Sequence, residues 1–360
     1  MNSLDKNLLE KLTIVIISKD RTKELEIVID YWLNTPCKLV VIHDSKEQLD
    51  SSNFNKNFLY IRSHEHYLIR LSLAENFITT PYSVICNDDE IFLIDPLLKF
   101  INYLDSNKTI EAIGGQVMAY SWGGNKLLAE FVYPYLNSHS NDDKSPLNRI
   151  RNTFETKNVM DITLIYRSDK FKKIIACCKN FSEFTVPVMG EMMFALFSSY
   201  FCRSKRFEDI YWMRNWFTPF HNSEKWDRGL TWNDWCHDSR FKQEVEKWNI
   251  DLELLLSNKT SLSRLQRKEV IKLLLDWRPK GLDKLAKKKS IVCEPIRNVL
   301  KLVIPGSLIW TLKKLFPLTR NHVMSDFKTV MKRQNSAYKI SLNDVDRFKL
   351  FVKRQKLVKK

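Results

Sequence analysis

The sequence predicts an α/β domain in which helices flank a mainly parallel sheet. Short, continuously apolar and β-branched segments, typical of strands covered on both faces, alternate with segments whose apolar residues recur at helical spacing. Polar or acidic residues follow several of these strands at their carboxyl ends. With 44% hydrophobic and 12% aromatic residues, the 360-residue chain has the composition of a folded protein rather than a disordered one.

The individual elements follow from this alternation. We expect, in chain order, a strand at 12–18, a helix at 25–33, strands at 37–45 and 58–63, a helix at 66–80 and a strand at 82–86. This order is typical of parallel strands joined by crossover helices. Farther along we expect a strand and loop at 111–124, a polar loop at 137–149, a strand and helix at 161–178 and a largely buried helix at 186–201.

Positive charge is concentrated in the C-terminal part of the chain. The formal net charge is +16, and residues 261–360 contain 26 Lys and Arg against 7 Asp and Glu, whereas residues 1–260 contain 32 against 35. This asymmetry predicts a slightly acidic globular domain over residues 1–255, followed by a basic, mostly helical region over residues 256–360 that meets an anionic partner.

Three interpretations of this basic region differ in their partner. Nucleic acid is not expected, because lysine dominates and no recognisable nucleic-acid-binding module is present. Peripheral attachment to an anionic membrane fits segment 296–316, which mixes aliphatic residues, Trp310 and lysines as an interfacial helix does. The third interpretation is a helical cap that packs on the N-terminal domain and exposes a solvated basic face.

Cysteine usage and the apolar runs predict a cytoplasmic protein. The chain has 7 cysteines, an odd number with no C-x-x-C pair, which favours buried, reduced thiols. The N-terminus lacks the basic and apolar regions of a secretory signal, and no apolar run reaches the roughly 18 residues that span a bilayer. With only 8 glycines, neither common glycine-rich phosphate loop is present.

A run of three acids, Asp88, Asp89 and Glu90, stands out after Asn87 and between two apolar segments. Ligands of parallel α/β sheets bind outside the carboxyl ends of the strands, and polar residues follow the strands at 18–21, 43–45 and 87–90. Carboxylates at such an edge suit Mg²⁺ or Mn²⁺ held together with substrate phosphates. The alternative for an isolated acidic run is a solvated turn.

Three segments resemble, in order and spacing, the N-terminal half of GT-A-fold glycosyltransferases of the family 2 kind. They are TIVIISKDRTKELEIVIDYWL, VVIHDS and LAENFITTPYSVICNDDEIF. The resemblance implies a GT-A-like (Rossmann-like) fold. It also implies a nucleotide site in which Asp20 and Arg21, with Ser18 before them, contact the donor and Asp44 binds the base or ribose.

The same resemblance places the D-x-D element of the family at Asn87, Asp88 and Asp89. An asparagine stands where the family has its first acid. Either the frame shifts to Asp88 and Glu90, or Asp89 carries the metal with weaker help. The metal candidates are therefore Asp89, Glu90 and Asp88, with Asn87 and Asp88 also assigned to the nucleotide donor.

A catalytic base is implied at a helix start well after the acidic run. The segment VMGEMMFAL offers Glu191 there, although a carboxylate at a helix N-terminus is also stabilised by the helix dipole alone. Asp161, at the head of a predicted strand, is the rival candidate, and Asp209 is the third. An inverting transfer needs such a base beside the acceptor hydroxyl.

The resemblance implies a glycosyltransferase of bacterial surface polysaccharide synthesis. It would move a sugar from a nucleotide-diphosphate donor to a glycan or lipid-linked glycan acceptor, with inversion and with help from Mg²⁺ or Mn²⁺. A different class stays open: a non-catalytic glycan-binding or polyanion-binding protein on a degenerate GT-A scaffold, which Asn87 allows.

Overall fold

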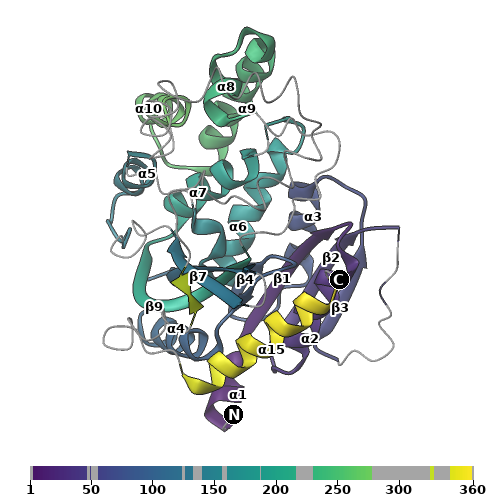
Figure 1. The fold of residues 1–360 in the computed structure, drawn as a ribbon. Coiled ribbons are helices and arrows are strands. Elements are labelled where there is room, and N and C mark those ends of the chain that lie inside the picture. The colour runs from purple at the N-terminus through teal and green to yellow at the C-terminus, as the bar shows by residue number, and fades with distance from the viewer. Residues whose placement is uncertain are drawn as a thin grey trace, which may run out of the picture.

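The computed structural model describes residues 3–46, 49, 56–123, 126–132, 140–155, 160–186, 188–215, 230–277, 325–327 and 341–358. Within these residues a ten-stranded mixed sheet runs through the molecule with helices on both faces (Figure 1). The predicted α/β class is confirmed. Segment 296–316, expected to meet a membrane, lies outside the described residues.

The described helices are α1 (Ser3–Leu9), α2 (Thr22–Leu33), α3 (Tyr67–Leu73), α4 (Ile94–Ser106), α5 (Pro146–Glu155), α6 (Ser168–Cys178), α7 (Met189–Phe201), α8 (Trp232–His237), α9 (Lys242–Lys259), α10 (Arg264–Leu275) and α15 (Leu342–Val358). The strands are β1 (Leu12–Lys19), β2 (Lys38–Asp44), β3 (Phe58–Arg62), β4 (Tyr82–Cys86), β5 (Ile91–Phe92), β6 (Ala112–Gly123), β7 (Lys126–Val132), β8 (Ile165–Arg167), β9 (Ser204–Asn215) and β10 (Ser325–Asp326). Among these helices none is both long and apolar enough to cross a membrane.

Most predicted elements are confirmed, one has a wrong boundary and one strand was missed. The polar loop expected at 137–149 is irregular over residues 140–145, but α5 begins at Pro146, because Leu147, Ile150 and Phe154 recur at helical spacing and pack into the core. The twelve-residue strand β9 was not predicted, since its burial changes from alternating to continuous along its length. The predicted boundary near residue 255 falls inside α9 and stays a prediction.

The N-terminal half of the sheet is parallel throughout, and it brings the predicted strand ends together. Strands β4, β1, β2 and β3 pair in parallel in that spatial order. Ser18 pairs with His43, and Lys19 pairs with Asp44, so the carboxyl ends of β1 and β2 are level. Beyond β4 the pairing is mainly antiparallel, except that β9 runs parallel to β6.

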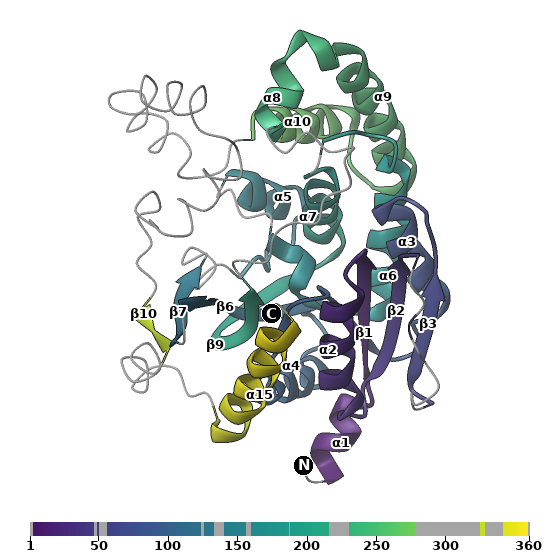
Figure 2. The same ribbon diagram turned by 45° about the vertical axis from the view of Figure 1, so that its right-hand side comes forward.

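Two apolar layers cover the two faces of the sheet (Figure 2). Ile14 and Ile16 of β1 point into one layer, which includes α2, α4 and α15, whereas Val15 points into the other, which includes α3, α6 and α7. This alternation is the period of two expected of a strand buried on both sides. The C-terminal helix α15 therefore belongs to the layer that covers the first strands.

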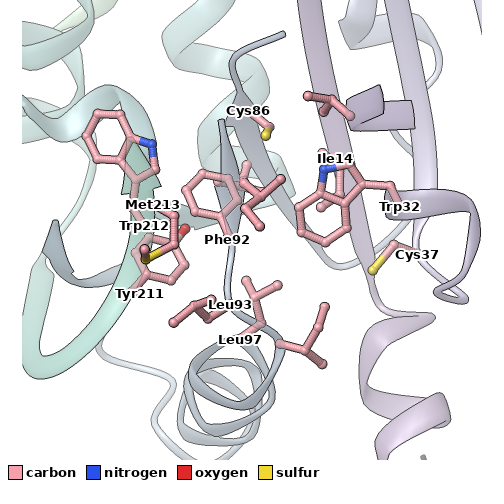
Figure 3. Close-up of a cluster of buried hydrophobic side chains, with 14 of the residues drawn as sticks. Ile14, Trp32, Cys37, Cys86, Phe92, Leu93, Leu97, Tyr211, Trp212 and Met213 are labelled. Carbon is pink, nitrogen blue, oxygen red and sulfur yellow. The ribbon is translucent and has the colours of Figure 1, made fainter. Parts of the chain in front are cut away.

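Phe92, two residues after Glu90, lies in the first apolar layer between Trp32 on one side and Tyr211 on the other (Figure 3). Its ring is 4.6 Å from that of Tyr211, stacked, and 6.4 Å from that of Trp32. Phe92 is fully buried. The Phe92 ring thus packs against both Trp32 of α2 and Tyr211 of β9.

Replacing this ring should destabilise the whole domain. Phe92→Ala is expected to lower the free energy of unfolding by about 3–5 kcal/mol, because a buried aromatic leaves a large cavity. Leu265→Ala is the control, since Leu265 is 80% exposed and should change stability by no more than about 0.5 kcal/mol. Urea unfolding measures both variants, and equal midpoints would contradict the packing described.

Candidate functional site

The three acids that follow β4 are buried. Asp88 and Asp89 are each 6% exposed and Glu90 is 3% exposed, whereas Asn87 before them is exposed. A solvated turn, the alternative left open by the sequence, is therefore wrong. Buried carboxylates require partners, because an unpaired buried charge is strongly unfavourable.

Arg21 supplies the partner for the first two acids. Its Nη1 lies 2.7 Å from Asp88 Oδ1, and its Nη2 lies 2.7 Å from Asp89 Oδ2. The hydroxyl of Ser18 donates to the other oxygen of Asp88, at 2.7 Å. The structure thus brings together three residues that the sequence assigned to the donor site, Ser18, Arg21 and Asp88, and joins them to Asp89.

Glu90 has a separate set of partners. Its Oε2 accepts hydrogen bonds from Asn87 Nδ2, at 2.6 Å, and from the indole of Trp212, at 2.8 Å. Arg214 Nε lies 3.4 Å from its Oε1. Trp212 and Arg214 both come from β9, which pairs with β5 immediately after the acids.

The acidity of this cluster is shifted by its burial. Burial raises the pKa of Asp88 above its ordinary value, although the charge of Arg21 opposes the shift. Burial likewise raises the pKa of Glu90, against the opposing charge of Arg214. The charge on Asp89 adds to both increases. Perturbed carboxylates of this kind are characteristic of functional sites.

A strained turn joins β1 to α2 at the same edge. Asp20 has φ 51°, in the left-handed region that a residue other than glycine seldom adopts, and its amide donates to the carbonyl of Asp44 at 2.9 Å. This bond ties the end of β1 to the end of β2. It also places Arg21 at the N-terminal boundary of α2, where its side chain reaches the acids.

Asp44 lies at the end of β2 with two basic neighbours. His64 Nδ1 lies 2.8 Å from its Oδ1, and Lys19 Nζ lies 3.1 Å from its Oδ2. Burial alone would raise the pKa of Asp44, but these two hydrogen bonds outweigh it and the pKa is lowered. Asp44 is therefore held as a carboxylate, the form that accepts hydrogen bonds from ribose hydroxyls.

Glu191, the first candidate for the base, is exposed at the first turn of α7. Surrounding protein nevertheless raises its pKa, and Arg214 is the charged side chain that opposes the shift. The same arginine forms an ion pair with Glu90, so its charge acts on both Glu90 and Glu191. The turn before Glu191 packs against α3, where a Cβ on Gly190 would come within 3.1 Å of Leu68.

The two rival base candidates have other partners. Asp161 is buried and its Oδ1 lies 3.0 Å from Nη2 of Arg206, which is buried as well. Burial raises the pKa of Asp161 against the charge of Arg206. Asp209 pairs with Lys99 at 2.6 Å on the surface. Both sets of contacts are those of structural ion pairs, which leaves Glu191 as the better candidate.

Sequence reasoning missed several residues of this edge. Arg70 is buried in α3, and its Nη1 and Nε donate to the carbonyls of Ser18 and Glu65. The sequence does contain a sign of this burial, because Arg70 lies between Leu68 and Leu71 on the apolar side of the predicted helix. No local pattern marks Arg214, whose role depends on a pairing between distant strands.

Whether the acids could hold a divalent cation depends on which of their carboxylate oxygens already have partners. Among the described residues, no group of three or more His, Cys, Asp or Glu side chains converges as a metal site. Asp88 uses both of its oxygens on Arg21 and Ser18, whereas the ion pair of Asp89 uses Oδ2. Of the oxygens of Asp88 and Asp89, Oδ1 of Asp89 thus lies outside these contacts and could ligate a hard cation, which needs one or two carboxylates beside substrate phosphates.

Comparisons with known proteins give structural neighbours only. No family model and no curated protein matches the chain. Staphylococcus aureus TarS 1–349 in complex with UDP-GlcNAc matches 82% of this chain and 76% of its own, with 12% identity and a TM-score of 0.49. The mannosyltransferase PcManGT from Pyrobaculum calidifontis, in complex with GDP-Man and Mn²⁺, matches 85% and 84%, with 11% identity and a TM-score of 0.36.

Of these neighbours, PcManGT is described as a mannosyltransferase, and TarS 1–349 is in complex with UDP-GlcNAc. Identities of 12% and 11% and TM-scores of 0.49 and 0.36 do not assign an activity to this chain. Its function is therefore argued from its own residues.

The Asp161 and Arg206 pair gives a direct test of the structural assignment. Asp161→Asn is expected to lower the free energy of unfolding by about 3–5 kcal/mol, because it leaves Arg206 buried opposite a neutral group. Asp209→Asn removes a surface pair and should change stability by less than about 1 kcal/mol. Thermal or urea unfolding compares the two; a stable Asp161→Asn variant would return Asp161 to the list of candidate bases.

Proposed function

We propose that this protein is a glycosyltransferase that uses a nucleotide-diphosphate sugar. The observation that supports this most strongly is the convergence of Ser18, Arg21, Asp88 and Asp89 at the carboxyl ends of β1 and β4. A nucleoside diphosphate needs cations for its phosphates and a carboxylate for its ribose. This sheet edge offers both.

Each part of the donor has a candidate partner. Asp44, held ionised by His64 and Lys19, suits the ribose or base. Arg21 suits the diphosphate, because its guanidinium can exchange a carboxylate for a phosphate with the same bidentate geometry. Asp89 Oδ1 would hold Mg²⁺ or Mn²⁺, which supplies charge neutralisation to the diphosphate as it leaves.

Glu191 is proposed as the base of an inverting transfer. The acceptor hydroxyl oxygen forms a bond to the anomeric carbon while the bond from that carbon to the diphosphate oxygen breaks, and the hydroxyl proton passes to Glu191. Its exposed position admits an acceptor. Its raised pKa brings its basicity closer to that required near neutral pH.

The biological setting extends this proposal beyond the site. The acceptor would be a glycan or lipid-linked glycan of bacterial surface polysaccharide, and the protein would act in the cytoplasm, at the inner face of the membrane. The family resemblance of the sequence supports this setting.

A non-catalytic glycan-binding or polyanion-binding protein is the second candidate. One contact favours it: Asn87, at the first D-x-D position, donates to Glu90 rather than offering a carboxylate to a cation. In that case the surrounding arginines would bind an anionic ligand without turnover.

Turnover of nucleotide sugars decides between these candidates. With Mn²⁺ and a panel of nucleotide sugars, Glu191→Gln is expected to lower kcat by about 10²–10⁴-fold without weakening donor binding, because it removes the base alone. Asp89→Asn is expected to raise the KM for the donor. Glu246→Gln, an exposed acid on α9, is the control and should leave both constants unchanged.

The panel also has outcomes that contradict the proposal. Absence of both turnover and nucleotide binding in the unmodified protein would overturn it. Glycan binding without turnover would favour the second candidate. Unchanged kinetics in Glu191→Gln and Asp89→Asn would remove the roles assigned to these two residues.

Membrane attachment through segment 296–316 is tested by substitution rather than by deletion. Because α15 contributes Phe348, Phe351 and Val352 to the core, deletion of the C-terminal region is unsuitable. Lys313→Gln with Lys314→Gln is expected to weaken binding to anionic liposomes about 30-fold, since each lysine near such a surface contributes roughly 1 kcal/mol. Sedimentation with neutral liposomes is the control, and unchanged binding would contradict attachment.

A further inference from the structure

The inward face of α15 has polar residues at both ends. Its buried residues recur at helical spacing, with Asp344 first, the apolar Phe348, Phe351 and Val352 in the middle, and Gln355 last. Asp344 is 1% exposed and Gln355 is 4% exposed. A core-facing helix is expected to be apolar along this face, so the two polar ends require their own explanation.

Asp344 caps another helix. Its carboxylate accepts the backbone N–H groups of Ile94, at 2.9 Å, and Asp95, at 3.0 Å. These amides begin α4, whose N-cap residue Leu93 makes no side-chain cap. A carboxylate at this position satisfies two orphan donors and interacts favourably with the helix dipole.

Gln355 holds the acidic run itself. Its Nε2 donates to the carbonyl of Asp89 at 3.0 Å, and its Oε1 accepts from the hydroxyl of Tyr120 at 2.8 Å. The same hydroxyl lies 3.2 Å from the Asp89 carbonyl. Because a phenol has one hydrogen and the shorter contact is to Gln355, the amide of Gln355 is the principal donor to Asp89.

Aromatic contacts between these two ends fix the helix in place. The ring of Phe348 lies 5.0 Å from that of Tyr120, and the ring of Phe351 lies 5.8 Å from that of Tyr31. Tyr31 in turn donates its hydroxyl to the carbonyl of Phe92 at 2.9 Å. The helix therefore contacts α2, β6 and the segment that follows the acids.

We propose that Gln355 is a positioning residue of the donor site: by holding the carbonyl of Asp89 it fixes the backbone that presents Asp88 and Asp89 to Arg21 and to the donor diphosphate. The effect on the donor rests on the proposed function, whereas the effect on the backbone does not. Glu191 belongs to α7 and is not reached by these bonds. Loss of Gln355 should therefore raise the KM for the donor far more than it lowers kcat.

The test compares two substitutions on the same face of α15. Gln355→Met keeps the length of the side chain and removes its hydrogen bonds to Asp89 and Tyr120, together with the long one that its Oε1 accepts from Asn215 Nδ2 at 3.5 Å. Val352→Ala removes buried apolar atoms one turn away and leaves the Asp89 carbonyl paired. Both variants lose stability, so only an effect specific to the acids separates positioning from packing.

Two measurements are made on each full-length variant. Hydrogen exchange of the amides at 88–92, without ligand, should become at least about tenfold faster in Gln355→Met and stay within about twofold in Val352→Ala, as one lost buried hydrogen bond implies. Calorimetric affinities for UDP, GDP, CDP and ADP with Mn²⁺ should weaken about tenfold for the nucleotide that binds, again in Gln355→Met alone.

The outcomes separate this inference from the proposed function. Unchanged exchange at 88–92 in Gln355→Met, or equal changes in both variants, would overturn the positioning role. If the unmodified protein binds none of the nucleotides, the proposed function fails while the exchange measurement still decides the role of Gln355. Should Gln355→Met not fold, Tyr120→Phe removes only the hydroxyl that orients Gln355 and should speed the same amides at least about threefold; no change would overturn the inference.

Discussion

Burial of three consecutive carboxylates at the end of β4 is the constraint on which the rest of this sheet edge depends. Two like charges about 4 Å apart repel by roughly 4 kcal/mol at an effective dielectric constant of 20. Arg21 compensates Asp88 and Asp89, and Arg214 compensates Glu90. Because a buried charge without its partner is strongly unfavourable, the folded domain without ligand needs both arginines beside these acids.

This requirement explains features that are otherwise unrelated. The left-handed φ of Asp20 turns the chain so that Arg21 starts α2 facing the acids. The pairing of β9 with β5 carries Arg214 to the same edge, although Arg214 comes 123 positions after Ile91 in the chain. Strand β9, in the mixed part of the sheet, thus places Arg214 beside carboxylates that follow β4, in the parallel part.

The features that the sequence predicted correctly are those that depend on local sequence patterns. Strands β1, β2 and β4, the ends of these strands and the place of Glu191 at a helix start all follow from periodicity and from short motifs. The contacts of Arg214 and Gln355 could not be predicted, because each depends on a partner far away in the chain and neither residue interrupts a local pattern. Gln355 in particular looks like one more polar residue in a basic helix until the buried face of α15 is known.

The charge balance of the acidic run limits how a donor diphosphate can bind. With all three acids ionised, Arg21 and Arg214 leave one net negative charge, and the pKa values of Asp88 and Glu90 are raised mainly by burial, with a further increase from the charge on Asp89. An anionic diphosphate would add to this negative charge.

If a divalent cation at Asp89 relieves the repulsion, the carboxylates are stabilised as anions and binding releases protons. If Arg21 moves to the phosphates instead, Asp88 loses its principal cation and takes up a proton. The two arrangements therefore couple donor binding to pH with opposite signs, since affinity rises with pH in the first and falls in the second.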